Sequence, residues 1–197
     1  MGTQLSEETI AKVVDFHGHS CPGVSIGIRA SELARRELGD LPDKRLVCIT
    51  ETDMCGVDAI QYLTGCTFGK GNLIHRDHGK MAFTFYNRES GHGFRCILKP
   101  EARGDAGKEL SALSRKIADG TASQEDEQRV PGLRQQMQER IMTAELDALF
   151  EIMEPLAAMP RRARVLESLT CEDCGEATME SRTQRFAGKT LCQPCFD

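Results

Sequence analysis

The sequence predicts an α+β fold with a two-layer core, in which helices pack on a mixed β-sheet. Two observations support this prediction. Residues 1–100 follow the order helix, helix, strand, helix, strand, strand, and beyond residue 100 the strand signals vanish while helical spacing continues. Cysteines then gather at the C-terminal end. We therefore expect three parts: an α+β core over residues 1–100, a helical extension and linker over 101–165, and a four-cysteine domain over 166–197.

Two helices are predicted to open the chain. Ser6 is a suitable N-cap for a helix over residues 6–16, whose apolar residues share one face. A glycine-containing segment interrupts this helix. Pro22 then suits the first turn of a second helix, which Gly39 ends.

Three strands are predicted next. Residues 46–50 form a short apolar run, rich in β-branched side chains and typical of a buried strand. Residues 81–86 and 94–98 are two more, separated by a segment rich in turn residues. Cys48 and Cys96 lie inside these runs, so we expect buried, inert thiols.

A third helix is predicted between the first two strands. It is expected to begin after Thr52 or Asp53 and to end at Gly65. The loop that follows is rich in glycine and contains Cys66.

The extension is predicted to contain a helix near residues 105–118 and a longer one capped by Ser123. Pro131 marks either the true start of the longer helix or a kink. Its apolar stripe has two open interpretations, packing on the protein's own core or contact with a second subunit. The stripe consists of Leu133, Met137, Ile141, Ala144, Ala148 and Ile152.

Composition limits the class of protein. The chain has 197 residues, a net charge of −5 and no Trp, which argues against nucleic-acid binding. No apolar run approaches the ~20 residues of a membrane span. The N-terminal residues lack the basic and apolar regions of a secretion signal, so we expect a cytoplasmic protein. Nine cysteines in such a protein indicate metal or thiol chemistry rather than disulfides.

Four of the cysteines have the spacing of a zinc ribbon, Cys171-x2-Cys174-x17-Cys192-x2-Cys195. Each Cys-x2-Cys pair is expected to form a tight turn, with a hairpin over residues 178–190 between the pairs. Two disulfides or an iron–sulfur cluster are the alternatives to zinc. Six acidic and three basic residues over 166–197 favour contact with a protein over contact with phosphates.

The segment from Phe16 to Gly23 contains a second candidate site. His17, His19 and Cys21 alternate along it, so in an extended, curved segment they would point to one side. Cys21 occupies a helix N-cap position, where the helix dipole and free N–H groups favour a thiolate.

Cys55 is expected in the first turn of the third helix, and Cys66 lies in a flexible loop that could also reach the site. Together with His17, His19 and Cys21, these residues predict a mixed nitrogen and sulfur site for zinc or another transition metal. The residue types alone leave open which of the five are ligands. His75, His78 and His92 are expected among loop residues. The spacing of His75 and His78 could chelate a metal, but a solvated pair is the expectation.

Several ordered motifs resemble the FmdE family, which takes its name from formylmethanofuran dehydrogenase. They are His17-Gly-His-x-Cys-Pro-Gly, Gly27-Ile-Arg29, Glu51-x-Asp-x-Cys-x-Val-Asp-Ala-Ile-Gln61, Gly65-Cys-Thr-x-Gly-Lys-Gly-Asn-Leu73 and Gly79-Lys-x-Ala-Phe83. The resemblance covers roughly residues 10–100. It implies a core related to the catalytic domain of glyceraldehyde-3-phosphate dehydrogenase, a homodimer, and metal binding through His17, His19, Cys21, Cys55 and Cys66.

The resemblance favours a metal-binding accessory or regulatory protein of a molybdenum or tungsten oxidoreductase, with a partner subunit from that enzyme. It leaves open whether this chain has catalytic activity of its own, because in the namesake complex the chemistry belongs to other subunits. The alternatives are a zinc- or thiol-dependent enzyme that uses the core cluster, and a redox or iron–sulfur protein. A transcription regulator is disfavoured by the acidic four-cysteine region.

Overall fold

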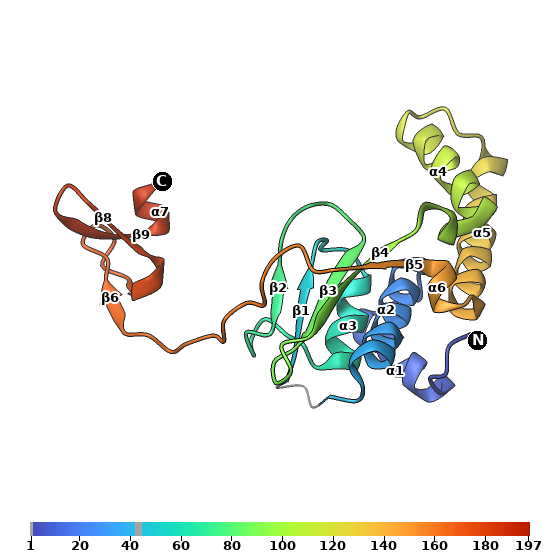
Figure 1. The fold of residues 1–197 in the computed structure, drawn as a ribbon. Coiled ribbons are helices and arrows are strands. Elements are labelled where there is room, and N and C mark those ends of the chain that lie inside the picture. Colours follow the sequence, from blue (N-terminus) through green and yellow to red (C-terminus); the bar gives the residue numbers. More distant parts are fainter. Residues whose placement is uncertain (1, 42–44) are drawn as a thin grey trace. The chain divides into compact units, whose positions relative to one another are not determined.

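The computed structural model describes residues 2–41 and 45–197 and divides the chain into two compact units, Met1–Arg161 and Arg162–Asp197. The first unit contains a five-stranded sheet with helices α2 and α3 on one face (Figure 1). In the described residues we find no helix with the length and hydropathy of a membrane span.

The first two helices begin and end close to the predicted residues. Helix α1 spans Glu7–His17, and the Ser6 hydroxyl accepts the Thr9 N–H at 3.2 Å. Helix α2 spans Pro22–Leu38, with Cys21 as its N-cap.

Helix α3 spans Gly56–Thr64 and ends at Gly65 as predicted, but its start was predicted too early. The Thr50 hydroxyl donates to the Thr52 carbonyl at 2.6 Å, and the Thr52 hydroxyl accepts the Met54 N–H at 3.2 Å. These local bonds hold the chain in turns and delay the helix.

The sheet has the strand order β2-β1-β3-β4-β5. Three of its strands match the predicted ones: β1 (Leu46–Thr50), β3 (Ala82–Asn87) and β4 (Gly93–Leu98). Two edge strands were not predicted. Strand β2 (Leu73–His75) pairs in parallel with β1, and β5 (Phe150–Met153) pairs antiparallel with β4.

Both faces of the sheet are covered. The helix face contributes Phe83, Phe85 and Cys96 to the main core. On the opposite face Tyr86 packs with Val47 and Ile49, and its hydroxyl donates to the Ala157 carbonyl. The chain after β5 therefore covers this second face, and the expected two-layer α+β core is confirmed.

The region expected as a helical linker belongs to the first unit. Helix α4 (Gly104–Ala118) packs against α5 (Gln124–Thr143), and the short elements η1 (Pro100–Arg103) and α6 (Leu146–Leu149) flank this pair. Ser123 caps α5 as predicted, in a capping box with Asp126. Pro131 lies inside α5, so it does not mark the start of the helix.

The predicted helix is too long at its C-terminal end. Ala144 has an extended backbone, with φ −71° and ψ 158°, and the chain turns there towards β5. Leu133, Met137 and Ile141 are buried, and the latter two belong to the protein's own main core, as the first of the two interpretations proposed. Ile152 lies on β5 instead and is exposed.

The second unit consists of short elements around the four cysteines. Strands β8 and β9 form a hairpin whose turn, Ala187 and Gly188, has φ values of 50° and 85°, as a type I′ turn requires. The predicted hairpin is thus present, shifted towards the C-terminus. The elements are β6 (Ser168–Thr170), β7 (Ala177–Met179), η2 (Glu180–Arg182), β8 (Thr183–Phe186), β9 (Lys189–Cys192) and α7 (Gln193–Phe196).

Candidate metal centres

The second unit brings together the sulfur atoms of all four predicted cysteines. Those of Cys171, Cys174, Cys192 and Cys195 all lie within 4.8 Å of one another. The Cys192 N–H donates to the Cys171 sulfur at 3.3 Å. N–H groups of Cys174, Cys192 and Asp173 lower the pKa of Cys171 to about 6. Four sulfurs at this separation, one of them favoured as a thiolate, fit a tetrahedral zinc site.

The first unit contains a mixed cluster of two imidazoles and two thiols. One ligand atom from each of His17, His19, Cys21 and Cys55 lies within 4.8 Å of the others. His17 is the last residue of α1, and Cys21 and Cys55 are the N-cap residues of α2 and α3. Three helix ends therefore meet at one point.

Glycines let the two cysteine-bearing helices approach closely. A Cβ atom on Gly27 would lie 2.0 Å from the Gly56 carbonyl oxygen, which real structures do not allow. One on Gly23 would lie 2.9 Å from Cys55 Cβ. The backbones of α2 and α3 thus touch, and this contact places Cys55 beside Cys21.

Asp58 orients one of the imidazoles. Its Oδ2 lies 2.7 Å from His17 Nδ1, and Gln61 Nε2 donates to its other carboxylate oxygen at 3.2 Å. A carboxylate at Nδ1 leaves Nε2 free as a metal ligand. His17 Nε2 does face the cluster, 4.0 Å from the Cys21 sulfur.

The rest of the cluster differs in burial. His19 is exposed and its ring lies against that of His17, with 4.5 Å between centroids. Burial raises the pKa of Cys55, and the neighbouring Cys21 thiol raises it further. A bound cation would offset both effects by stabilising the thiolate, so the donor set fits a transition metal.

Cys66 does not join this cluster, contrary to expectation. Its side chain is fully buried in the main core, where Asn72 Nδ2 donates to its sulfur at 3.7 Å. The same Asn72 also closes the loop, since its side-chain oxygen accepts the Thr67 N–H at 3.0 Å. Cys48 and Cys96 are fully buried as predicted, and burial raises the pKa of Cys96 to about 12.

The remaining three histidines belong to neither cluster. His78 is partly exposed, but its Nδ1 lies 3.2 Å from a carboxylate oxygen of Glu51. His75 lies on β2 rather than in a solvated loop, and its Nε2 is buried with no hydrogen-bond partner among the described residues. His92 is exposed.

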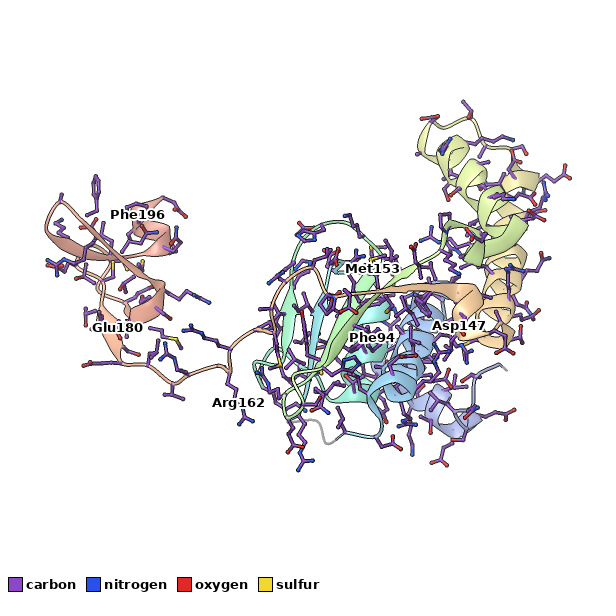
Figure 2. The ribbon with its side chains drawn as sticks, viewed as in Figure 1. Phe94, Asp147, Met153, Arg162, Glu180 and Phe196 are labelled. Atoms are coloured by element: carbon purple, nitrogen blue, oxygen red, sulfur yellow. The ribbon has the colours of Figure 1, made fainter. Side chains whose placement is uncertain are left out.

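Sequence reasoning also missed a buried ion pair on the sheet. Arg95 donates to both carboxylate oxygens of Glu51, at 2.6 and 3.0 Å, and each side chain is 4% exposed. Arg95 also contacts the sulfur of Met153 on β5. Figure 2 labels Met153. The bonds from Arg95, and that from His78, keep the pKa of Glu51 below its usual value.

Comparisons with known proteins agree with this architecture. A family model described as FmdE, molybdenum formylmethanofuran dehydrogenase operon, matches residues 16–151. A second model, the prokaryotic dksA/traR C4-type zinc finger, matches residues 164–197. The first match includes the helical extension and the first two residues of β5, in keeping with the compact unit that ends at Arg161.

Two relatives are similar over most of this chain. A tungsten formylmethanofuran dehydrogenase FmdE-like protein from Syntrophus aciditrophicus has a crystal structure with a TM-score of 0.62 and 26% identity, covering 96% of this chain and 91% of that one. A probable S-adenosyl-L-methionine-binding protein of Archaeoglobus fulgidus is 31% identical, covering 94% of this chain and 52% of the relative. This chain thus spans about half the length of that relative.

The fold and the two clusters define an α+β protein with a His/Cys cluster and a C4-type zinc-finger unit. The chain belongs to the FmdE family.

Proposed function

We propose that this chain is a metal-binding accessory protein of a molybdenum or tungsten oxidoreductase. In this proposal His17, His19, Cys21 and Cys55 bind a transition metal, zinc foremost, and the four C-terminal cysteines bind a structural zinc. The observation that supports it best is the convergence of the four core ligand atoms, with Asp58 behind His17.

The accessory role is supported by the family and by the name of the solved relative. We propose a homodimer and contact of the zinc-finger unit with a subunit of the oxidoreductase. All nine cysteines are free thiols in the structure, which suits a reducing compartment such as the cytoplasm.

Metal content of the full chain, purified without oxygen, tests the proposal. Inductively coupled plasma mass spectrometry should find two metal ions per wild-type chain. A His17→Ala/Cys55→Ser variant should keep the zinc-finger metal, and a Cys171→Ser/Cys174→Ser variant should keep the core metal. If the second variant contains no metal, the core cluster is not a metal site and the proposal fails.

One observation favours a second candidate, an enzyme with a metal-bound water or substrate. His19 is the exposed member of the core cluster, and a catalytic zinc keeps an open coordination position. X-ray absorption on the Cys171→Ser/Cys174→Ser variant, which should keep only the core metal, would count the ligands of that metal. Two sulfurs and two nitrogens indicate the accessory role, whereas an additional oxygen ligand or a missing nitrogen favours the enzyme. Visible absorption would instead indicate an iron–sulfur cluster.

A further inference from the structure

Cys21 and Cys55 are neighbours because of backbone packing rather than because a metal gathers them. Each is the N-cap residue of a helix, and the two helices touch through Gly23, Gly27 and Gly56. Both sulfurs lie on the same side of Gly23, since a Cβ atom there would be 3.6 Å from Cys55 Sγ and 3.7 Å from Cys21 Sγ. The two sulfurs are also within 4.8 Å of each other.

The other three thiols of the first unit are shielded. Cys48, Cys66 and Cys96 are each 0% exposed and belong to the main core, whereas Cys21 and Cys55 are partly exposed. Among the thiols of the first unit, a small oxidant arriving from solvent therefore reaches this pair first. The neighbouring His19 is exposed, so the approach is open.

We propose that Cys21 and Cys55 are a reversible oxidation site that forms an intramolecular disulfide. Hydrogen peroxide oxidises one thiol to a sulfenic acid and leaves as water. The second thiol then attacks that sulfur, a second water leaves, and the S–S bond forms. A dithiol reductant returns both thiols and is itself oxidised to a disulfide.

The bond requires little movement. A disulfide has its sulfur atoms about 2.05 Å apart, so the two thiols must close less than 3 Å from their separation of at most 4.8 Å. Both side chains can rotate at Cα–Cβ, and the glycine contact between the helices stays in place. No strand or helix has to unfold.

The disulfide has a consequence that rests on the proposed function. It removes two of the four ligand atoms of the core cluster and leaves His17 and His19 alone. Two imidazoles do not complete a tetrahedral site, so oxidation would release a core metal. The core site would then hold its metal only while the thiols are reduced.

Peroxide treatment of the full chain tests the inference. Metal-free and zinc-loaded protein are oxidised, alkylated, digested with trypsin without reduction, and analysed by mass spectrometry. We expect a cross-link between the tryptic peptides 13–29 and 46–70, with fragment ions that place it on Cys21 and Cys55. Cys21→Ser and Cys55→Ser should each abolish it, whereas His19→Ala should retain it.

Zinc release is measured in parallel with a chromophoric indicator in the Cys171→Ser/Cys174→Ser background, and should rise in proportion to the cross-link. Oxidation to sulfinic acid without a cross-link, or a cross-link to Cys48 or Cys66, would overturn the inference. If the wild-type core binds no metal yet the cross-link forms, the proposed function fails while the oxidation site stands.

Discussion

The carboxylate of Asp58 fixes which nitrogen of His17 faces the core cluster. We predict that Asp58→Asn weakens metal binding at this site about 10–100-fold, the usual effect of losing an outer carboxylate. The fold should be unchanged, because Asp58 is partly exposed. Competition with a chromophoric chelator measures the affinity.

Asp53→Asn is a matched control for this experiment. Asp53 lies in the segment before α3, two residues before Cys55, and is exposed. It should bind metal as tightly as the wild type. Equal affinities for the Asp58 and Asp53 variants would show that the carboxylate has no part in the site.

Glu51 makes stability depend on pH. Its pKa is lowered in the fold from 4.5, chiefly by Arg95, so its stabilising effect is complete above pH 4.5 and is lost as the pH falls through the lower folded value. Glu51→Gln leaves the buried Arg95 charge uncompensated and should cost about 3–5 kcal/mol at pH 7. Urea unfolding from pH 7 to pH 3 measures the free energy of unfolding of both proteins. The difference between wild type and Glu51→Gln should become smaller below about pH 4. If this difference in unfolding free energy stayed constant with pH, the Glu51–Arg95 ion pair would not be the cause of the pH dependence.

Residue types alone indicated five core candidates, and the structure brings four of them together. The histidines and Cys21 are close in sequence, and a helix start predicted near Cys55 was sufficient to include it. Asp58 was missed because its partner His17 is 41 residues away. Cys66 was wrongly included because only the folded loop shows Asn72 turning its thiol into the core.

Among the elements, the crossing of α2 and α3 supports the core cluster. Gly27→Ala would place a Cβ atom 2.0 Å from a backbone oxygen of Gly56, and backbone cannot move aside as a flexible side chain can. The helices must separate, so we expect a loss of about 1–3 kcal/mol or more together with weaker metal binding. Thermal unfolding and metal titration measure the two effects.

Gly132→Ala is the matched control, because alanine fits at this position without a clash. Gly132 also lies inside a helix, α5, and a Cβ atom there meets nothing within 4 Å. Helix propensity alone then predicts stabilisation by about 0.5–1 kcal/mol and unchanged metal affinity. If both variants behaved alike, the close approach of α2 and α3 would not be what holds the cysteines together.

Caps and glycine stops predicted most helix boundaries, because their hydrogen bonds are local. The strands β2 and β5 were missed because strands pair with residues that are distant in the sequence. Phe150–Met153 fits the helical stripe of α5 by spacing, yet it pairs with β4, and Leu98 lies opposite Phe150. Such long-range pairing outweighs local propensity, and one sequence does not reveal it.

At the scale of the whole molecule, the predicted three parts become two units because the extension packs on the core. Met137 and Ile141 are 7% and 0% exposed within the first unit. Charged substitutions there would therefore disrupt folding rather than separate subunits. The proposed homodimer must use another surface.

The two units also differ in what stabilises them. The first has a main core of many apolar side chains, whereas the buried cluster of the second consists of Cys171, Leu191 and Cys192, with Cys195 packed against it. So small a core cannot supply much folding free energy. Binding of a structural zinc supplies about 10–16 kcal/mol in zinc-finger peptides, enough to decide whether the second unit folds.

We therefore predict that Cys171→Ser/Cys174→Ser unfolds residues 162–197 and leaves the first unit intact. Hydrogen–deuterium exchange of the full chain should show protection lost in peptides of the second unit, with peptides of the sheet and of α2 unchanged. His17→Ala/Cys55→Ser is the control, since it should leave the second unit protected. Retained protection in the cysteine variant would mean that the second unit folds without metal, and a loss that spread into β1 or β3 would mean that the two units fold together.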